Sequence, residues 1–115
     1  MLVWSACSLA GVVVLGVVAA STGLRYWAVG AAHGGLALVT FVLLLVGLRG
    51  PARGVEFGAG AFGRIAAVLV AITLLIGAGL LAARLRRRAP SPLVIGLHAT
   101  LGVAALVMLA AYVSV

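Results

Sequence analysis

Four long apolar runs divide this sequence, and they restrict its fold more than any other feature does. They cover about Leu2–Thr22, Trp27–Leu48, Phe62–Ala83 and Leu93–Val113. A helix of about 20 apolar residues crosses a hydrocarbon core about 30 Å thick. A lipid-embedded segment has to satisfy its own backbone hydrogen bonds, and an isolated run does so only as a helix. We therefore predict an all-α integral membrane protein, an up-down four-helix transmembrane bundle that forms one domain over residues 1–115.

The charged residues agree with a membrane location and exclude several functions. The chain is 66% hydrophobic and 8% charged, which is too little charge to cover the surface of a soluble domain. Its eight basic residues are all arginines in loops or at helix ends, so the net charge of +7 does not indicate nucleic-acid binding. Glu56 is the only acidic residue, and one carboxylate cannot form an acid–base pair. This composition favours a subunit over a stand-alone enzyme.

The distribution of arginines predicts an orientation. The first and third loops hold five of them and the second loop holds three; the five are Arg25, Arg84, Arg86, Arg87 and Arg88. Since cytoplasmic loops carry the excess of basic residues, we expect loops one and three in the cytoplasm and both termini outside, in the cell (inner) membrane. No basic residue precedes Arg25, so the first run lacks the charged start of a signal peptide and is expected to remain as a helix.

Two smaller features are expected to be structural. Cys7 is the only cysteine and lies in an apolar helix, where a thiol usually packs as a small hydrophobic group. The segment GAGAFG, residues 58–63, fits a dinucleotide-binding pattern that requires a preceding strand. Here it joins two membrane helices, so its glycines are expected to let the chain turn and the third helix start close to a neighbour.

Two histidines lie inside apolar runs, in AAHGGLAL (residues 31–38) and GLHATLGV (residues 96–103). Ionisable groups within a membrane are costly and usually functional. His33 and His98 each lie about six residues, or about 9 Å, into their predicted helices. Helices two and four run in the same direction in an up-down bundle. We therefore predict that both histidines lie at the same depth, on the side of loops one and three.

Small residues accompany both histidines. Gly34 follows His33 directly, and Gly102 lies four residues after His98. These glycines are predicted to leave a slot for a flat macrocycle between two imidazoles, a common way for a bundle core to hold a cofactor. His33 and His98 are therefore candidate axial ligands of the iron of one haem b.

The basic rim offers partners for haem propionates. Arg25 precedes His33 by eight residues, and Arg84 lies at the same predicted end of the bundle. A carboxylate near the membrane interface gains most from a charge-assisted hydrogen bond, so both arginines are candidate cofactor-binding residues.

The segment His98-Ala-Thr-Leu101-Gly102 resembles a pattern in transmembrane b-type cytochromes of the cytochrome b-561-like kind. The four-helix unit is also similar to that of haem A synthase. The resemblance implies a haem held between histidines of neighbouring helices, and only His33 and His98 match it. Members with two haems have four histidines, two near each face. The two histidines of this chain therefore imply a single haem near one face.

Other roles for the histidines stay open at this stage. They are structural hydrogen bonding, including a direct bond from His33 to His98, and a site for another metal or a quinone. One haem near one face does not cross the membrane, so a quinone or a partner protein has to supply the rest of an electron path. We expect an electron-transfer subunit in a homo-oligomer or larger complex. The alternative is a cofactor-free scaffold or accessory subunit.

The glycines also suggest how the helices associate. Gly30 and Gly34 are four residues apart, a spacing that lets membrane helices approach closely. Gly77 and Gly79 are expected to lie outside the cofactor slot, in patches that contact another subunit.

Overall fold

Four long helices make up most of the chain in a computed structural model that describes residues 1–22 and 27–115. They are α1 (Leu2–Ser21), α2 (Trp27–Gly47), α3 (Phe62–Leu85) and α4 (Pro92–Val113), with a short 3-10 helix η1 (Val55–Phe57) between α2 and α3. Each long helix is long and apolar enough to cross a membrane. The predicted all-α class with four membrane-spanning helices is confirmed.

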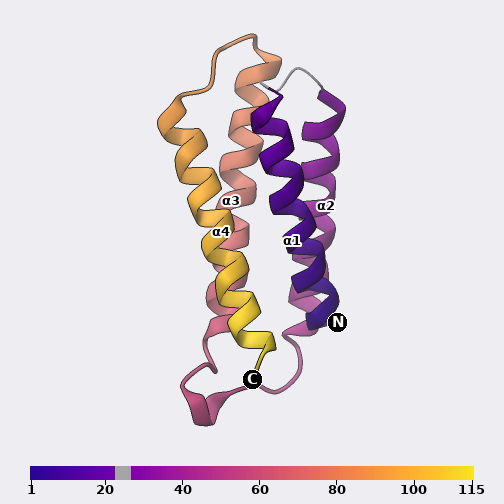
Figure 1. Cartoon of the computed structure of the whole chain (residues 1–115), viewed down its shortest axis with the longest axis vertical. Coiled ribbons are helices and arrows are strands. Elements are labelled where there is room, and N and C mark those ends of the chain that lie inside the picture. The colour runs from indigo at the N-terminus through magenta and orange to yellow at the C-terminus, as the bar shows by residue number, and fades with distance from the viewer. Residues whose placement is uncertain (23–26) are drawn as a thin grey trace.

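The helices run up and down along a bundle about 49 Å long. Both termini and the α2–α3 loop lie at one end, and the α3–α4 loop lies at the other (Figure 1). α1 packs mainly on α2 and α3 mainly on α4, while less extensive contacts join α1 to α4 and α2 to α3. The bundle therefore consists of two helical hairpins, and α2 and α4 face each other diagonally across it.

The inner face of each helix repeats every three or four residues, the spacing that returns a side chain to the same face of a helix. On α2 the buried positions are Ala37, Thr40 and Leu44, and on α4 they are Ala105, Leu109 and Tyr112. The remaining helices follow the same rule, with buried residues Ser5, Leu9, Val12 and Ala19 on α1 and Gly63, Ala66, Ala67 and Val70 on α3. Many of these residues are small, so the helices approach closely around a narrow core.

Polar groups within the bundle find local partners. Thr40 is fully buried and donates its hydroxyl hydrogen to the carbonyl oxygen of Leu36, and its hydroxyl also bonds that of Ser8 on α1. Ser5 donates to the carbonyl of Leu2 in the same way. Cys7, expected to pack inside, is exposed on α1 because it lies two residues from buried Ser5 and so on the opposite side of the helix.

The ends of α3 and α4 differ from the predicted ones by one or two residues. α4 begins at Pro92, which suits the first turn because proline has no N–H to satisfy there, and Ser91 precedes it. α3 continues past Ala83 to Leu85 and then closes with Arg87 in the left-handed region, at φ 55°. The N–H of Arg88 bonds the carbonyl of Ala83, which completes a C-terminal cap in which glycine is the usual left-handed residue.

The α2–α3 loop uses its glycines as predicted. Gly54 and Gly58 flank η1 with φ of 62° and 74°, where a side chain would be strained. Gly63 lies against the ring of Tyr112, and a Cβ atom there would be 2.7 Å from Cε1 of that ring. The GAGAFG segment therefore turns the chain and brings the start of α3 close to α4. The hydroxyl of Tyr112 also accepts a hydrogen bond from the backbone N–H of Arg53.

Candidate functional site

The two histidines meet between the two hairpins, near the end of the bundle that carries the α3–α4 loop. The imidazole centroids of His33 and His98 are 5.9 Å apart, and the ring planes are inclined by 66°. Their helices lie diagonally opposite, so each side chain reaches inward across the core. Each histidine is six residues after the first residue of its helix. The prediction of a common depth is confirmed.

Each histidine is held by the other helix of its own hairpin. Nδ1 of His33 is 2.9 Å from the carbonyl oxygen of Val12 on α1, and Nδ1 of His98 is 3.0 Å from that of Thr73 on α3. A carbonyl oxygen can only accept, so both Nδ1 atoms carry the hydrogen. In a neutral imidazole the other nitrogen, Nε2, then has a free lone pair. This arrangement, with Nδ1–H on a backbone carbonyl, fixes the ring of a metal-ligating histidine in many proteins.

A glycine accommodates each ring. Gly16 lies one turn after Val12, and a Cβ atom on it would be 3.0 Å from Cε1 of His33. Gly77 lies one turn after Thr73, and a Cβ atom there would be 3.0 Å from Cε1 of His98. Carbon atoms in favourable contact are about 3.5–4.0 Å apart, so any larger residue would crowd the rings.

The two hairpins therefore build equivalent halves of one site. Val12 and Gly16 on α1 correspond to Thr73 and Gly77 on α3, with the same separation of 61 residues in both cases. The buried residues of α2 and α4 also correspond when His33 is aligned with His98, since Thr40 then matches Ala105 and Leu44 matches Leu109. The structure thus extends the internal similarity that the two histidine segments show in sequence.

The glycines predicted beside the cofactor are not the ones that face the histidines. Gly34 is exposed and nothing lies within 4 Å of a Cβ atom built on it. It follows His33 by one residue, or about 100° of helical rotation, so it points away from the ring. Gly102 does face a neighbour, because its Cβ position is 3.7 Å from Cγ2 of Thr73 on α3.

Among the remaining glycines, Gly77 is the one that lies contrary to expectation. Gly30 and Gly34 pack on no other helix of the described chain, so their spacing serves no contact within the bundle. Gly77, expected on an outer patch, faces His98 inside the bundle, whereas Gly79 has nothing within 4 Å of its Cβ position.

Of the two arginines predicted to bind propionates, only Arg84 can be placed, because Arg25 lies outside the described residues. Arg84 is half-buried in the last turn of α3, at the same end of the bundle as the histidines. It lies seven residues after Gly77, which is two helical turns further along on the same face. Arg84 therefore stands above the histidine pair on the inner side of α3.

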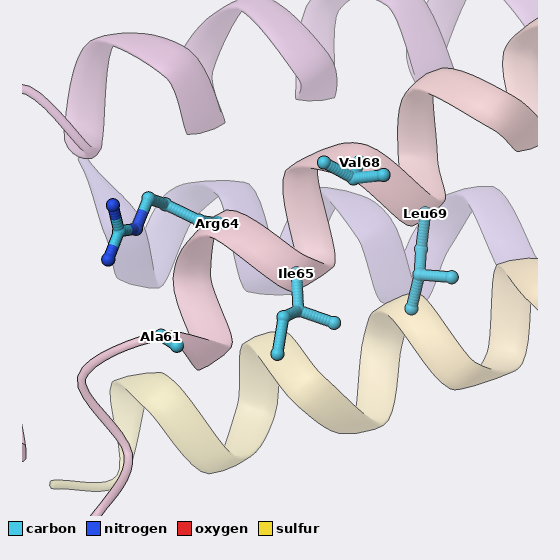
Figure 2. A pocket seen from close by; sticks show the side chains of 5 residues that line it. All are labelled: Ala61, Arg64, Ile65, Val68 and Leu69. Carbon is cyan, nitrogen blue, oxygen red and sulfur yellow. The ribbon is translucent and has the colours of Figure 1, made fainter.

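Two shallow grooves lie on the outside of the bundle, away from the histidines. One is lined by Leu38, Val39, Val42 and Leu43 of α2. The other lies at the start of α3, where Figure 2 shows Arg64 extending away from Ile65 and Leu69. Their linings are almost entirely apolar, as lipid-facing surfaces are, and they bring no reactive groups together.

No protein-family model, curated protein or solved structure matches this chain. Within residues 1–22 and 27–115, no three side chains of the kinds that ligate metal ions lie together. Within the described part of the chain, the imidazole pair is therefore the group of side chains best suited to bind a ligand.

Proposed function

We propose that the chain is a small membrane haem protein in which His33 and His98 are the two axial ligands of one haem b. The observation that carries this proposal is the pairing of the rings, with both Nδ1–H groups bonded to backbone carbonyls and both Nε2 lone pairs free. Two metal–nitrogen bonds of about 2.0–2.1 Å, with about 1.1 Å from each nitrogen to its ring centre, separate two centroids by about 6.2–6.4 Å. The observed 5.9 Å is a few tenths of an ångström shorter than this separation.

The charge of the site also suits haem. Glu56 is the only acidic side chain, and it lies beside the far end of the bundle from the histidines, so nothing in the core balances a bare divalent ion. A dication held by two neutral imidazoles in apolar surroundings is strongly disfavoured. A porphyrin brings two negative charges and four nitrogen ligands of its own, which leaves ferrous haem neutral at its centre and ferric haem with one positive charge.

A flat ring between the histidines would need α1 and α3 to move away from the imidazoles, since their glycines now lie against them. A macrocycle centred between His33 and His98 extends sideways from the line that joins them, and that direction leads toward α1 and α3. Gly16 and Gly77 leave those helices without a side chain beside the imidazoles. Arg84 stands two turns above Gly77 on the same face, so it is the described residue best placed to pair with a propionate.

Bound haem supplies a one-electron redox centre, so the corresponding role is electron transfer as a subunit or relay. We further propose a cell (inner) membrane location with the histidine end in the cytoplasm, on the basis of the arginine count. A quinone or partner protein exchanges electrons with the centre, and the outward-facing Gly30 and Gly34 offer a surface for a homo-oligomer or larger complex.

A second candidate is a cofactor-free scaffold or accessory subunit. One observation favours it: no buried side-chain nitrogen or oxygen lacks a hydrogen-bond partner within the described residues. The buried polar side-chain atoms therefore have their hydrogen bonds without a ligand. The histidines would then serve to join the helices of each hairpin.

Difference spectra distinguish the two candidates. The chain is produced with a haem supply, purified in mild detergent and measured as reduced-minus-oxidised absorption. We expect a low-spin b-type spectrum that disappears in His33→Asn and His98→Asn, because an asparagine amide still donates to the carbonyl of Val12 or Thr73 but offers no Nε2. Cys7→Ser is the matched control and keeps the spectrum. A colourless wild-type protein, or spectra unchanged in both asparagine variants, contradicts haem ligation and supports the scaffold.

A further inference from the structure

The loop between α3 and α4 carries three consecutive arginines on its surface. Arg86, Arg87 and Arg88 are all exposed, and they follow the last residue of α3 directly. Two backbone hydrogen bonds fix this turn. The N–H of Arg87 donates to the carbonyl of Arg84 at 2.8 Å, and the N–H of Arg88 donates to that of Ala83 at 2.9 Å. This pair of bonds is the Schellman motif of a helix end, so the three arginines project from one ordered turn.

The backbone of Arg87 indicates that its side chain has a use. Its φ of 55° lies in the left-handed region, where a Cβ atom is unfavourable and where glycine usually ends a helix. Arg87 is exposed, so packing inside the bundle does not explain a large side chain at this position. Strained residues of this kind cluster at ligand-binding positions. The guanidinium therefore points to a partner outside the bundle.

The spacing of arginines along α3 indicates the level of this turn in a membrane. Arg64 and Arg84 are 20 residues apart, which is about 30 Å along a helix. A hydrocarbon core is also about 30 Å thick. When these two arginines lie at the two edges of the core, residues 86–88 lie just beyond it. That is the level at which phospholipids carry their phosphates.

The surroundings of the turn match both parts of a phospholipid. Glu56, the only acidic side chain, lies in the α2–α3 loop at the opposite end of the bundle, so the arginines have no acidic partner nearby (Figure 1). Each helix joined by the turn presents two exposed leucines one helical turn apart, namely Leu81 and Leu85 on α3 and Leu93 and Leu97 on α4. Cations next to exposed apolar side chains suit a phosphate that is joined to acyl chains better than a free phosphate.

We propose that Arg86, Arg87 and Arg88 bind the phosphate of an anionic phospholipid, whose acyl chains lie along the exposed leucines of α3 and α4. A guanidinium offers paired N–H donors that fit phosphate oxygens. Each basic residue at a membrane surface favours negatively charged lipids, so a headgroup with net negative charge binds in preference to a zwitterionic one. The site rests on the proposed membrane location. It is separate from the histidine pair and does not depend on haem.

The test measures the dissociation constant of the first phosphatidylglycerol bound to the full-length protein in neutral detergent, by titration and native mass spectrometry. One triple variant replaces the three arginines of the turn by glutamine. The control triple variant changes the net charge equally at the other end of the bundle, at Arg49, Arg53 and Arg64. Each arginine near a membrane surface is worth about a fivefold change in affinity, so we expect binding about 100-fold weaker in the first variant. The control loses less than about fivefold, because its arginines are spread over residues 49–64 and share their end with Glu56.

Arg87→Gly gives a measurement that misfolding cannot imitate, because it removes the guanidinium and relieves the left-handed backbone at the same time. We expect it to bind phosphatidylglycerol about fivefold more weakly while the fold stays intact. Equal weakening in the two triple variants overturns the proposal, as does unchanged affinity in Arg87→Gly. Equal affinity for phosphatidylcholine, or displacement of the lipid by inorganic phosphate, also overturns it. A colourless protein that retains the preference for phosphatidylglycerol refutes the haem function and leaves this inference standing.

Discussion

Replacing Gly16 by alanine tests how closely α1 packs against the ring of His33. The new Cβ atom would lie 3.0 Å from Cε1 of His33, about half an ångström inside favourable contact. The ring cannot easily retreat, because its Nδ1 donates to the carbonyl of Val12 on the same helix and its other side meets His98. Either the hydrogen bond lengthens or α1 moves away from α2.

The expected change in the free energy of unfolding follows from two opposing effects. Crowding a well-packed core costs about 1–3 kcal/mol. Alanine is favoured over glycine within a helix by about 1 kcal/mol. Gly34→Ala provides the matched control, since it gains the same helix preference at an exposed position with nothing within 4 Å. The difference between Gly16→Ala and Gly34→Ala cancels helix preference and leaves about 1–3 kcal/mol for the crowding alone.

The assay is reversible unfolding in mixed micelles, followed by the loss of helical circular dichroism. Gly77→Ala repeats the experiment in the second hairpin, where the Cβ position is also 3.0 Å from His98, and is expected to give the same difference. If Gly16→Ala and Gly77→Ala are as stable as Gly34→Ala, the rings have room to move, and the argument from close packing is refuted.

Three further predictions concern the remainder of the bundle. Arg87→Gly relieves the left-handed backbone at the end of α3 and raises the free energy of unfolding by up to about 1 kcal/mol, and a lower stability in the same micelle assay contradicts this. Thr40→Val removes the hydroxyl that bonds Ser8 and is expected to cost about 1 kcal/mol; an unchanged midpoint shows that the pair contributes nothing. In a Cys7→Ser background, cysteines at positions 56 and 87 react with an impermeant reagent from opposite sides of the membrane, and labelling from one side refutes the up-down topology.

The helices and their order could be predicted because the hydrocarbon core sets their length and short loops set their directions. The common depth of His33 and His98 followed from the same two facts, since depth depends only on the count of residues from the start of each helix. The resemblance to b-type cytochromes and the orientation stay predictions. The structure adds to them the identity of the groups that hold the two rings.

The rotation of each helix about its axis could not be predicted. In soluble helices a polar face marks the side away from the core, but these helices are apolar all round and carry no such mark. Gly34 was therefore expected at the site while Gly16 was overlooked. One signal was present: Gly16 and Gly77 are separated by 61 residues, close to the 65 that separate the histidines, so a comparison of all four helices would have aligned them.

The position of the histidine pair restricts any electron path through this bundle. His33 lies six residues into α2, which has 21 residues, so about 9 Å of helix separates it from one end and about 21 Å from the other. The longer stretch holds Thr40 and Leu44 on its inner face, and neither side chain can carry an electron. Under the proposed haem function, electrons would therefore enter and leave the centre from the same end of the bundle or sideways through the lipid, from a quinone or a neighbouring subunit. Because each hairpin contributes one of the two histidines, any loosening between the hairpins also separates the imidazoles, so a ligand that binds both would stabilise the assembled bundle.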